Sequence, residues 1–566
     1  NSITATLCYP DSSRHLTGFN PMIYPDLHLI YTVNVESKGK NIEVTVDLDR
    51  PIPQEFIGKV GFNLEFFPGS LFGKPWIMDG QSGIFPQQPN SPLMTTQPNY
   101  LHTGNYHDGK KSLADMNKLI GKGYSPIVAD DIISEPYAKG TKFTSRPDDP
   151  YNKVTIESLS GDLQLFDGRM NHNNGWFVLR SNIKPGVTKG AVKWIITPNV
   201  VADWMYQPVI QTSQIGYHPT QDKEAVIEMD IRDNRKETAQ IIRIDADGEK
   251  VVKNVTPANW GKFLRYNYLK VNFTDVKEPG LYKIKYNTSV SPIFRIDNDV
   301  YARGVWQPVL EYFLPVQMCH MRVNEKYRVW HDCCHMDDAQ MAPAHNHIDG
   351  YDQKEGLSKF KPGEVVPGVN IGGWHDAGDF DLRIESQAGE SYILALAYEA
   401  FHPNLDVTSI DQINRVTEIH QPDGKNDLLQ QVENGALTVV NGYLALGRLY
   451  RGIICNDLRQ YVLLGDAAAM TDGKIGNEDD RWIFTEDNPG RELSTAAQLA
   501  AVSRVLKGFN DTLSVHCLDI ARKVYASTGS GNNRALFPKV QAAVELYLTT
   551  GEQPYMDFIL DNQELI

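Results

Sequence analysis

The sequence predicts a multidomain protein in which two N-terminal β-sandwich modules, the second immunoglobulin-like, precede an all-α domain. Three observations predict this architecture. The chain has 566 residues, too many for one ordinary domain. Short apolar–polar alternations recur until about residue 297, whereas from Tyr301 onwards the apolar residues follow a helical period. We therefore expect three domains, at residues 1–205, 206–298 and 299–566.

The first module is expected to be β-rich. Its alternating runs are separated by Gly, Pro and Asn, and they lie at residues 27–33, 42–46, 175–179 and 192–196. This pattern predicts a β-sandwich with long loops.

The second module, residues 206–298, contains an alternating strand at 225–229 and closes with strands at 280–286 and 291–296. Its size and strand spacing are typical of an immunoglobulin-like sandwich.

The C-terminal part is predicted to be helical. A first helix is expected from Tyr301 to about Met321, because Val305, Val309, Leu310, Phe313 and Leu314 fall on one face. Further helices are expected at about 385–402, 426–449, 493–509, 511–528, 535–551 and 553–565, with almost no strand between them. This order favours an array of antiparallel helical hairpins or an α/α barrel.

Charge and hydropathy exclude several classes of partner. With 55 basic and 70 acidic side chains, the net charge of −15 disfavours nucleic acid and anionic membranes. No run of 18 or more apolar residues occurs, so no transmembrane segment is expected. The six cysteines are too few and too scattered to indicate a disulfide scaffold.

The segment Gly372–Phe380 places two carboxylates, Asp376 and Asp379, three residues apart in a glycine-rich turn. If both face one side, they can hold a single water and shift each other's pKa, which suits general-base chemistry. A capping turn or a calcium-binding loop is the alternative interpretation of the same spacing.

The residues Gly372-Gly373-Trp374-His375-Asp376-Ala377-Gly378-Asp379-Phe380 resemble the signature of family 9 glycoside hydrolases, the inverting β-1,4-glucanases. That signature usually reads GGW-aromatic-DAGD-aromatic. The resemblance also covers Asn426–Gln431, Leu493–Phe509 and Asp519–Lys523. Segments 214–219 and 280–282 resemble the immunoglobulin-like module that precedes many family 9 catalytic domains.

The resemblance implies an (α/α)6 barrel of twelve helices, of which this chain would contain the N-terminal part. The barrel would be incomplete here, and a second chain could complete it. A secreted, periplasmic or cell-surface location is also implied, with any signal peptide outside this sequence.

The activity implied is inverting hydrolysis of β-1,4-glucosidic bonds in cellulose, mixed-linkage glucan or xyloglucan. Asp379 would be the general base and Asp376 would share the water. The general acid, a Glu near the end of the family's barrel, is expected beyond Ile566. The aromatic neighbours of the carboxylates, Trp374, His375 and Phe380, are expected to stack on a glucosyl ring. The alternative is a catalytically incompetent carbohydrate-binding or surface-assembly protein on the same fold.

No cofactor is required for this chemistry, but a structural metal is implied. By resemblance to family members with a zinc site, Cys319, Cys334 and His335 would be three zinc ligands. The fourth is expected three residues after the base, where this chain has Leu382, and His345 or His347 could substitute. Buried free thiols beside loop histidines are the alternative.

Calcium is the other candidate metal. Hard oxygen ligands occur at Asp337 and Asp338 and again at Asp349 and Asp352. Solvated loop carboxylates are the alternative at these positions.

Overall fold

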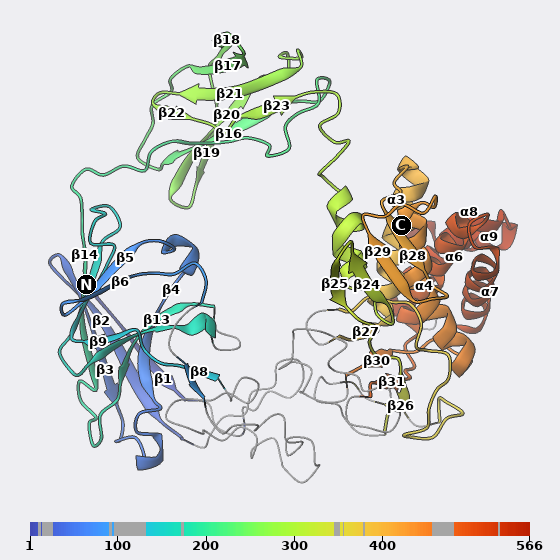
Figure 1. The fold of residues 1–566 in the computed structure, drawn as a ribbon, viewed down its shortest axis with the longest axis horizontal. Coiled ribbons are helices and arrows are strands. Elements are labelled where there is room, and N and C mark those ends of the chain that lie inside the picture. Colours follow the sequence, from blue (N-terminus) through green and yellow to red (C-terminus); the bar gives the residue numbers. More distant parts are fainter. Residues whose placement is uncertain are drawn as a thin grey trace. The chain divides into compact units, whose positions relative to one another are not determined.

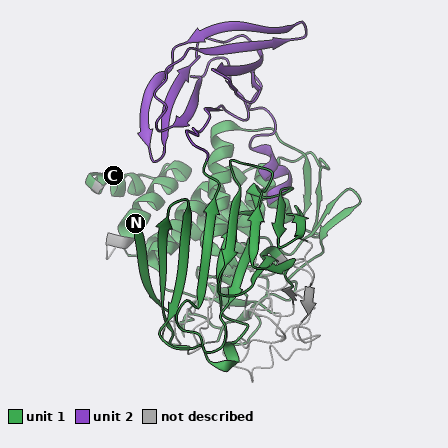
Figure 2. Ribbon diagram, turned by 90° about the vertical axis from the view of Figure 1, so that its left-hand side faces the viewer, with its two compact units in different colours: residues 1–200, 314–566 green, residues 201–313 purple. Residues whose placement is uncertain are grey.

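The structure is a computed structural model. It describes residues 1–9, 13, 27–89, 93–95, 132–170, 175–343, 351, 353–354, 356–376, 380–455, 480–529 and 533–565. Residues 1–200 together with 314–566 make one compact unit and residues 201–313 make the other (Figure 2). The predicted boundaries near 205 and 298 stay predictions.

Residues 1–200 form antiparallel sheets around one core. An eight-stranded sheet has the order β1 (Ser2–Cys8), β2 (Ile30–Lys38), β3 (Asn41–Leu48), β14 (Val192–Pro198), β11 (Val154–Ser158), β10 (Lys142–Ser145), β5 (Pro75–Met78) and β6 (Gln81–Ile84). A four-stranded sheet has the order β4 (Gly61–Phe66), β13 (Phe177–Asn182), β12 (Leu163–Asp167) and β9 (Ala138–Gly140). A separate pair comprises β7 (Leu93–Thr95) and β8 (Ile132–Ser134).

One tryptophan shows how the two larger sheets share their core. Trp194 on β14 is fully buried, and its Nε1 donates to Ser181 Oγ on β13 over 2.9 Å. Its ring packs edge-on against Phe62 on β4, with centroids 5.1 Å apart. The sheet-rich character predicted for this part of the chain is confirmed.

Residues 201–313 contain two further antiparallel sheets. One has the order β15 (Val209–Gln211), β16 (Glu224–Asp230), β20 (Tyr266–Asn272) and β19 (Ala258–Phe263). The other has the order β18 (Gly248–Val255), β17 (Ala239–Asp245), β21 (Gly280–Tyr286) and β22 (Ser289–Val290), with β23 (Phe294–Ile296) also paired to β21. Ile227, Ile241 and Leu269 from both sheets meet in one buried cluster, as the predicted immunoglobulin-like sandwich requires.

The six later helices predicted from the sequence are present, and each predicted end agrees to within four residues. They are α3 (Ile384–Phe401), α4 (Asp427–Leu446), α6 (Pro489–Leu506), α7 (Asp511–Ser527), α8 (Asn533–Thr550) and α9 (Gln553–Asp561), followed by a 3-10 turn at Gln563–Leu565 (Figure 1). Helix α6 lies against α3, α7 and α8. Asn426, Asn488 and Asn510 cap α4, α6 and α7, and each side-chain oxygen accepts from a backbone N–H of the first turn. Among the described residues, no helix is both long and apolar enough to cross a bilayer.

The first predicted helix is much shorter than expected. Instead of running from Tyr301 to Met321, it is a π-helical turn, Val309–Phe313, followed by α2, Leu314–Val316. Val309 and Phe313, expected on the buried face, are 47% and 55% exposed. Pro315 explains the early end, because proline has no N–H to donate to the preceding turn.

The prediction of almost no strands between the helices is wrong. One small sheet has the order β25 (Arg328–His331), β24 (Arg322–Glu325), β29 (Val416–Ile419) and β28 (Thr408–Asp411). Another has the order β26 (Gln340–Met341), β31 (Trp482–Phe484), β30 (Gly452–Ile454) and β27 (Leu382–Arg383). These strands have two to four residues, too few to show a period of two. They nevertheless bring segments far apart in the sequence to the glycine-rich turn.

Candidate functional site

The beginning of the glycine-rich turn lies against helix α4. Gly372 and Gly373 both have left-handed backbones, with φ of 70° and 86°. A Cβ on Gly372 would lie 2.4 Å from the carbonyl oxygen of Asn434, so only glycine fits there. The N–H of Gly373 donates to Asn434 O over 2.9 Å, and Asn434 Nδ2 donates back to Gly373 O over 3.1 Å. The two glycines therefore let the turn bind directly to the helix backbone.

Trp374 belongs to the core. It is 1% exposed, and its Nε1 donates to Gln431 Oε1 over 2.8 Å. Its backbone N–H donates to Gln387 Oε1, and its carbonyl accepts from Gln387 Nε2. Gly435 makes room for the ring, since a Cβ there would lie 2.4 Å from it. This burial disagrees with the predicted sugar-stacking role of Trp374.

Asp376 differs from the buried Trp374 and His375 that precede it, because its side chain is 30% exposed. Its carboxylate lies 3.1 Å from Arg383 Nε in an ion pair, and its N–H donates to Asp381 O over 3.0 Å. The predicted base, Asp379, lies outside the described residues. Of the two predicted catalytic carboxylates, the structure thus places Asp376, at a position that water can reach.

A second carboxyl group interacts with Asp376. The pKa of Glu390 on α3 is raised to about 7 by loss of surrounding solvent, and the negative charge of Asp376 adds to the effect. Sequence reasoning did not single out Glu390, because nothing in the sequence indicates that α3 faces the turn.

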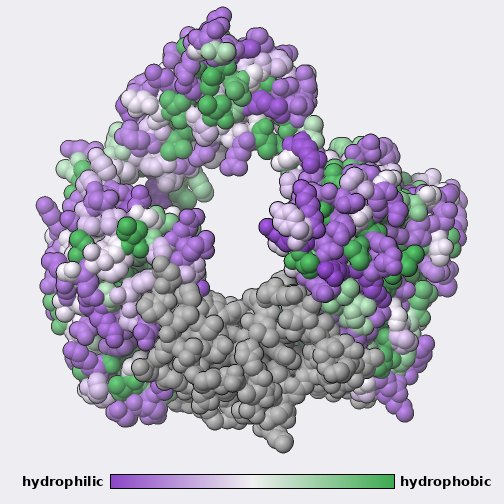
Figure 3. All heavy atoms as spheres, viewed as in Figure 1, coloured by the Kyte–Doolittle hydropathy of each residue, from purple (hydrophilic) through white to green (hydrophobic). Residues whose placement is uncertain are grey.

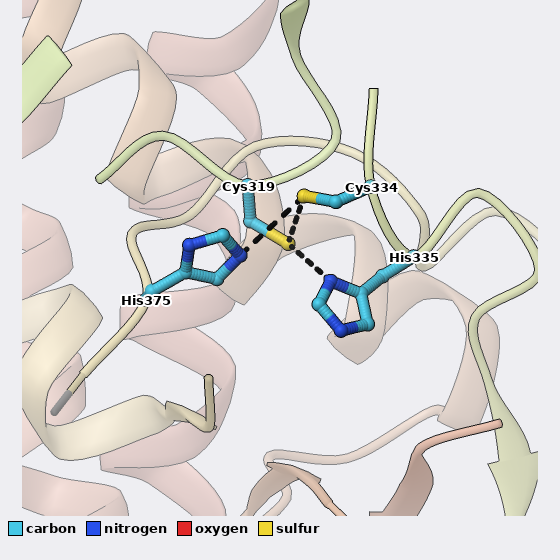
Figure 4. A group of neighbouring side chains, drawn as sticks. All are labelled: Cys319, Cys334, His335 and His375. Carbon is cyan, nitrogen blue, oxygen red and sulfur yellow. Dashed lines mark hydrogen bonds between the residues drawn. The ribbon is translucent and has the colours of Figure 1, made fainter. Parts of the chain in front are cut away.

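The residue before Asp376 joins a buried cluster. Cys319, Cys334, His335 and His375 point toward one another, and one ligand-type atom from each lies within 4.8 Å of all the others (Figure 4). The two sulfurs are 3.8 Å apart, Cys319 Sγ is 3.7 Å from His335 Nδ1, and Cys334 Sγ is 3.4 Å from His375 Nε2. None of the four residues is more than 7% exposed.

This donor set fits a tetrahedral metal ion. With Zn–S bonds of about 2.3 Å and Zn–N bonds of about 2.0 Å, zinc needs S···S separations of about 3.8 Å and S···N separations of about 3.5 Å. The three spacings given above match these values, and the other pairs of donor atoms lie within 4.8 Å. Two thiols and two imidazoles are also the ligands that zinc prefers in structural sites.

The surroundings of His375 differ from the prediction. The fourth member is His375, to which the sequence interpretation gave a sugar-stacking role. Leu382, at the position expected for the fourth ligand, is fully buried among apolar residues. The proposed substitutes, His345 and His347, lie outside the described residues. Phe380, the third predicted stacking residue, is 9% exposed, and its ring packs on His375 with centroids 5.0 Å apart.

Electrostatics in the cluster favours metal-binding forms of the side chains. Burial lowers the pKa of His335 to about 4 and also lowers the pKa of His375, so both rings are neutral near pH 7. Burial opposes ionisation of Cys319, but the hydrogen bond from Cys334 and the charge of Arg481 hold the pKa of that thiol well below its usual value. The same hydrogen bond, together with burial, raises the pKa of Cys334. One thiolate is therefore favoured even without a metal.

The predicted calcium ligand Asp338 is already engaged. It is 4% exposed and pairs with both His320 and Arg481. Asp349 and Asp352 lie outside the described residues. Asp338 thus belongs to a buried ion-pair network, and its carboxylate does not face an open cation site.

Two stretches of the chain match known families. Residues 309–565 match glycosyl hydrolase family 9, and residues 205–291 match the cellulase N-terminal Ig-like domain. The first stretch contains the glycine-rich turn and all four members of the Cys/His cluster.

Several characterised proteins are similar to this chain. A xyloglucan-specific endo-β-1,4-glucanase of Bacteroides ovatus is 25% identical over 369 residues, which cover 62% of this chain and 58% of that protein. Endoglucanase D of Acetivibrio thermocellus is 19% identical over 378 residues, covering 63% of this chain and 54% of that protein. The chain thus spans a little over half the length of the curated relatives it matches.

Similar solved structures include one described as Bacteroides ovatus GH9, with 19% identity, a TM-score of 0.45 and coverage of 62% of this chain and 64% of that chain. Another is a zinc-binding triple mutant of a family 9 endoglucanase, with 20% identity, a TM-score of 0.43 and coverage of 61% and 62%.

Proposed function

We propose that this chain, whose residues 309–565 match glycosyl hydrolase family 9, carries the water-activating side of an inverting hydrolase that cleaves β-1,4-glucosidic bonds of a glucan. The observation that carries the proposal is the family match over residues 309–565, which includes the complete Gly372–Phe380 signature. The relatives named as endoglucanases point to a β-glucan substrate, and the most identical of those described above is named for xyloglucan. Cellulose, mixed-linkage glucan and xyloglucan are the substrates to test.

Asp379 is the proposed general base, and Asp376 is proposed to share the attacking water. The exposure of Asp376 and its ion pair with Arg383 support this role, because the cation orients a carboxylate that solvent can reach. Inversion also requires a carboxylic acid about 6.5–9.5 Å from the base on the other side of the glycosidic bond. The proposed donor is the Glu that the family resemblance predicts beyond Ile566.

The test is the Asp379→Ala variant of the complete gene product, assayed by release of reducing ends from soluble glucans. We expect the rate to fall by about 10²- to 10⁴-fold, because proton transfer contributes that much. Added azide or formate should restore part of the rate by replacing the missing carboxylate. Asp411→Ala, at a carboxylate at the end of β28, is the matched control and should keep the wild-type rate.

An unchanged rate in Asp379→Ala would contradict the assignment of the base. A different outcome is that the wild-type protein migrates more slowly in glucan-containing gels and releases no reducing ends. That result would favour the alternative of a carbohydrate-binding or surface-assembly protein.

We further propose that Cys319, Cys334, His335 and His375 hold a structural zinc ion. The spacing, burial and chemistry of the four donors support this. When bound, zinc would cross-link the segments that carry these residues and neutralise the thiolates, and it would take no part in bond cleavage. Metal analysis of the purified protein should give one zinc per chain, falling to none in Cys334→Ser.

The incomplete (α/α)6 barrel also stays a proposal. Exposed apolar side chains on its helices support it, namely Ile393 and Phe401 on α3, Leu444 on α4, Val515 on α7 and Leu548 on α8. On the face drawn in Figure 3, hydrophobic residues lie among hydrophilic ones over this helical part. We propose that further helices, from the same gene product or from a second chain, cover them. Addition of such helices should raise the unfolding temperature.

A further inference from the structure

A buried ion-pair triad lies next to the Cys/His cluster. His320, Asp338 and Arg481 have fully buried side chains and come from three separate segments of the chain. Asp338 Oδ2 accepts from His320 Nε2 over 2.8 Å, and Asp338 Oδ1 accepts from Arg481 Nε over 3.1 Å. Arg481 Nη2 also donates to Asp338 Oδ2, which makes the pair bidentate. One carboxylate thus binds both cationic side chains.

The remaining donors of the triad bind the two ends of the glycine-rich turn. His320 Nδ1 donates to the carbonyl oxygen of Gly372 over 2.9 Å. Arg481 Nη1 donates to the carbonyl oxygen of Phe380. Since carbonyl and carboxylate oxygens only accept, both ring nitrogens of His320 must donate, and the ring is an imidazolium. The triad therefore bridges the backbone on either side of Asp376.

Arg481 also connects the turn to the candidate metal centre. Its Nη2 lies 3.1 Å from Cys319 Sγ, toward which it donates. A buried guanidinium is costly unless it is paired, and here it binds Asp338, the Cys319 sulfur and a backbone carbonyl at once. Only the planar fork of arginine reaches several acceptors in this way, because lysine offers a single ammonium group.

We propose that His320, Asp338 and Arg481 form a clamp that positions the carboxylate-bearing turn, with Arg481 as the positioning residue for the hydrolytic reaction. The triad touches neither substrate nor water in this role. It fixes the carbonyls of Gly372 and Phe380, and through them the backbone that carries Asp376. The catalytic part of this inference rests on the proposed function, whereas the clamp itself does not.

The test compares Arg481→Lys with the wild-type complete gene product. Lysine keeps the charge but cannot bind Asp338, Cys319 and Phe380 together, so the turn should loosen. We expect kcat on a soluble glucan to fall about 10- to 100-fold, with KM changed less than about two-fold, because the side chain does not contact substrate. Metal content should equal that of wild type, since all four donor residues remain.

Hydrogen–deuterium exchange supplies a readout that needs no activity. The N–H groups of Gly373, His375 and Asp376 donate to backbone carbonyls, so a peptide spanning the turn should be protected in wild type. In Arg481→Lys this peptide should exchange at least about ten-fold faster. If wild type releases no reducing ends, the proposed function fails, but the exchange comparison still decides the clamp.

The matched control is Arg504→Lys. Arg504 on α6 makes a bidentate pair with Glu399, at 2.7 and 2.9 Å, and also pairs with Glu545. The Arg504→Lys variant should have a lower unfolding temperature than wild type, with unchanged kcat and unchanged hydrogen exchange in the turn. If Arg481→Lys does not fold, His320→Gln tests the other arm, because glutamine cannot bind Gly372 and Asp338 together.

The proposal would be overturned if Arg481→Lys or His320→Gln folds and shows the wild-type kcat and the wild-type rate of hydrogen exchange in the turn. So would a loss of kcat that only matches the unfolded fraction, or equal effects in Arg481→Lys and Arg504→Lys.

Discussion

His375 and Asp376 are adjacent in sequence but lie in opposite surroundings. His375 is 7% exposed and joins the buried cluster with two thiols, whereas the side chain of Asp376 is 30% exposed and pairs with Arg383. The buried side of the turn is fixed by many contacts, and the exposed side offers a carboxylate to solvent. The comparison teaches that one short turn combines a buried, hydrogen-bonded support with a carboxylate that solvent can reach.

The largest effect should come from the exposed side. Asp376→Asn is expected to lower the rate of glucan hydrolysis by about 10²-fold, because a neutral amide cannot hold and orient the attacking water beside the proposed base as a carboxylate does. Stability should change by no more than about 0.5 kcal/mol, since the side chain is partly exposed and surface ion pairs contribute little. Reducing-end assays and urea unfolding measure the two effects. A large loss of stability with an unchanged rate of glucan hydrolysis would contradict this division between the two sides of the turn.

On the buried side of the turn, substitution is expected to affect stability and metal binding most. His375→Ala should abolish metal binding and lower the free energy of unfolding by at least about 2 kcal/mol, because loss of a metal is among the most destabilising changes. Metal analysis and thermal unfolding check this. His402→Ala, at the exposed C-cap of α3, is the control and should retain both metal and stability.

Trp374→Phe distinguishes core packing from sugar stacking. Phenylalanine keeps an aromatic ring but leaves Gln431 Oε1 without the indole N–H, so we expect a loss of about 1–3 kcal/mol in stability. The KM for glucan should stay unchanged. A raised KM for glucan with wild-type stability would indicate that Trp374 contacts the sugar.

The smallest effect concerns a buried acid outside the turn. Burial raises the pKa of Asp427, the first residue of α4, to about 7, against about 3.9 in unfolded chains. Between these values the folded state binds more protons than the unfolded state, so this group's contribution to stability falls as pH rises from about 4 to about 7. In Asp427→Asn, urea unfolding should depend less on pH in this window. An unchanged pH dependence would show that Asp427 ionises normally.

The six helices α3, α4, α6, α7, α8 and α9 could be predicted from the sequence to within four residues at each end, and three of them begin at an asparagine cap. The turn could be predicted from its glycines and paired acids. The strands of two to four residues could not, because their pairing depends on partners far along the chain.

Three members of the Cys/His cluster, Cys319, Cys334 and His335, could be predicted from the resemblance to family members with a zinc site. His375 was expected to bind sugar because it flanks the two carboxylates of the turn. Arg481 was missed because the carbonyl of Phe380 that it binds lies 101 residues away. Only tertiary structure shows that such a residue supports the turn.

His375 is expected to support the turn from its buried side while Asp376 faces the substrate. The most direct test of this division is a crystal structure of the complete gene product with a cello-oligosaccharide, with data recorded at the zinc absorption edge. We predict an anomalous peak among Cys319, Cys334, His335 and His375, and a glucosyl unit above the carboxylate of Asp376. A sugar bound away from Asp376, or His375 turned out of the cluster to face the sugar, would contradict this account.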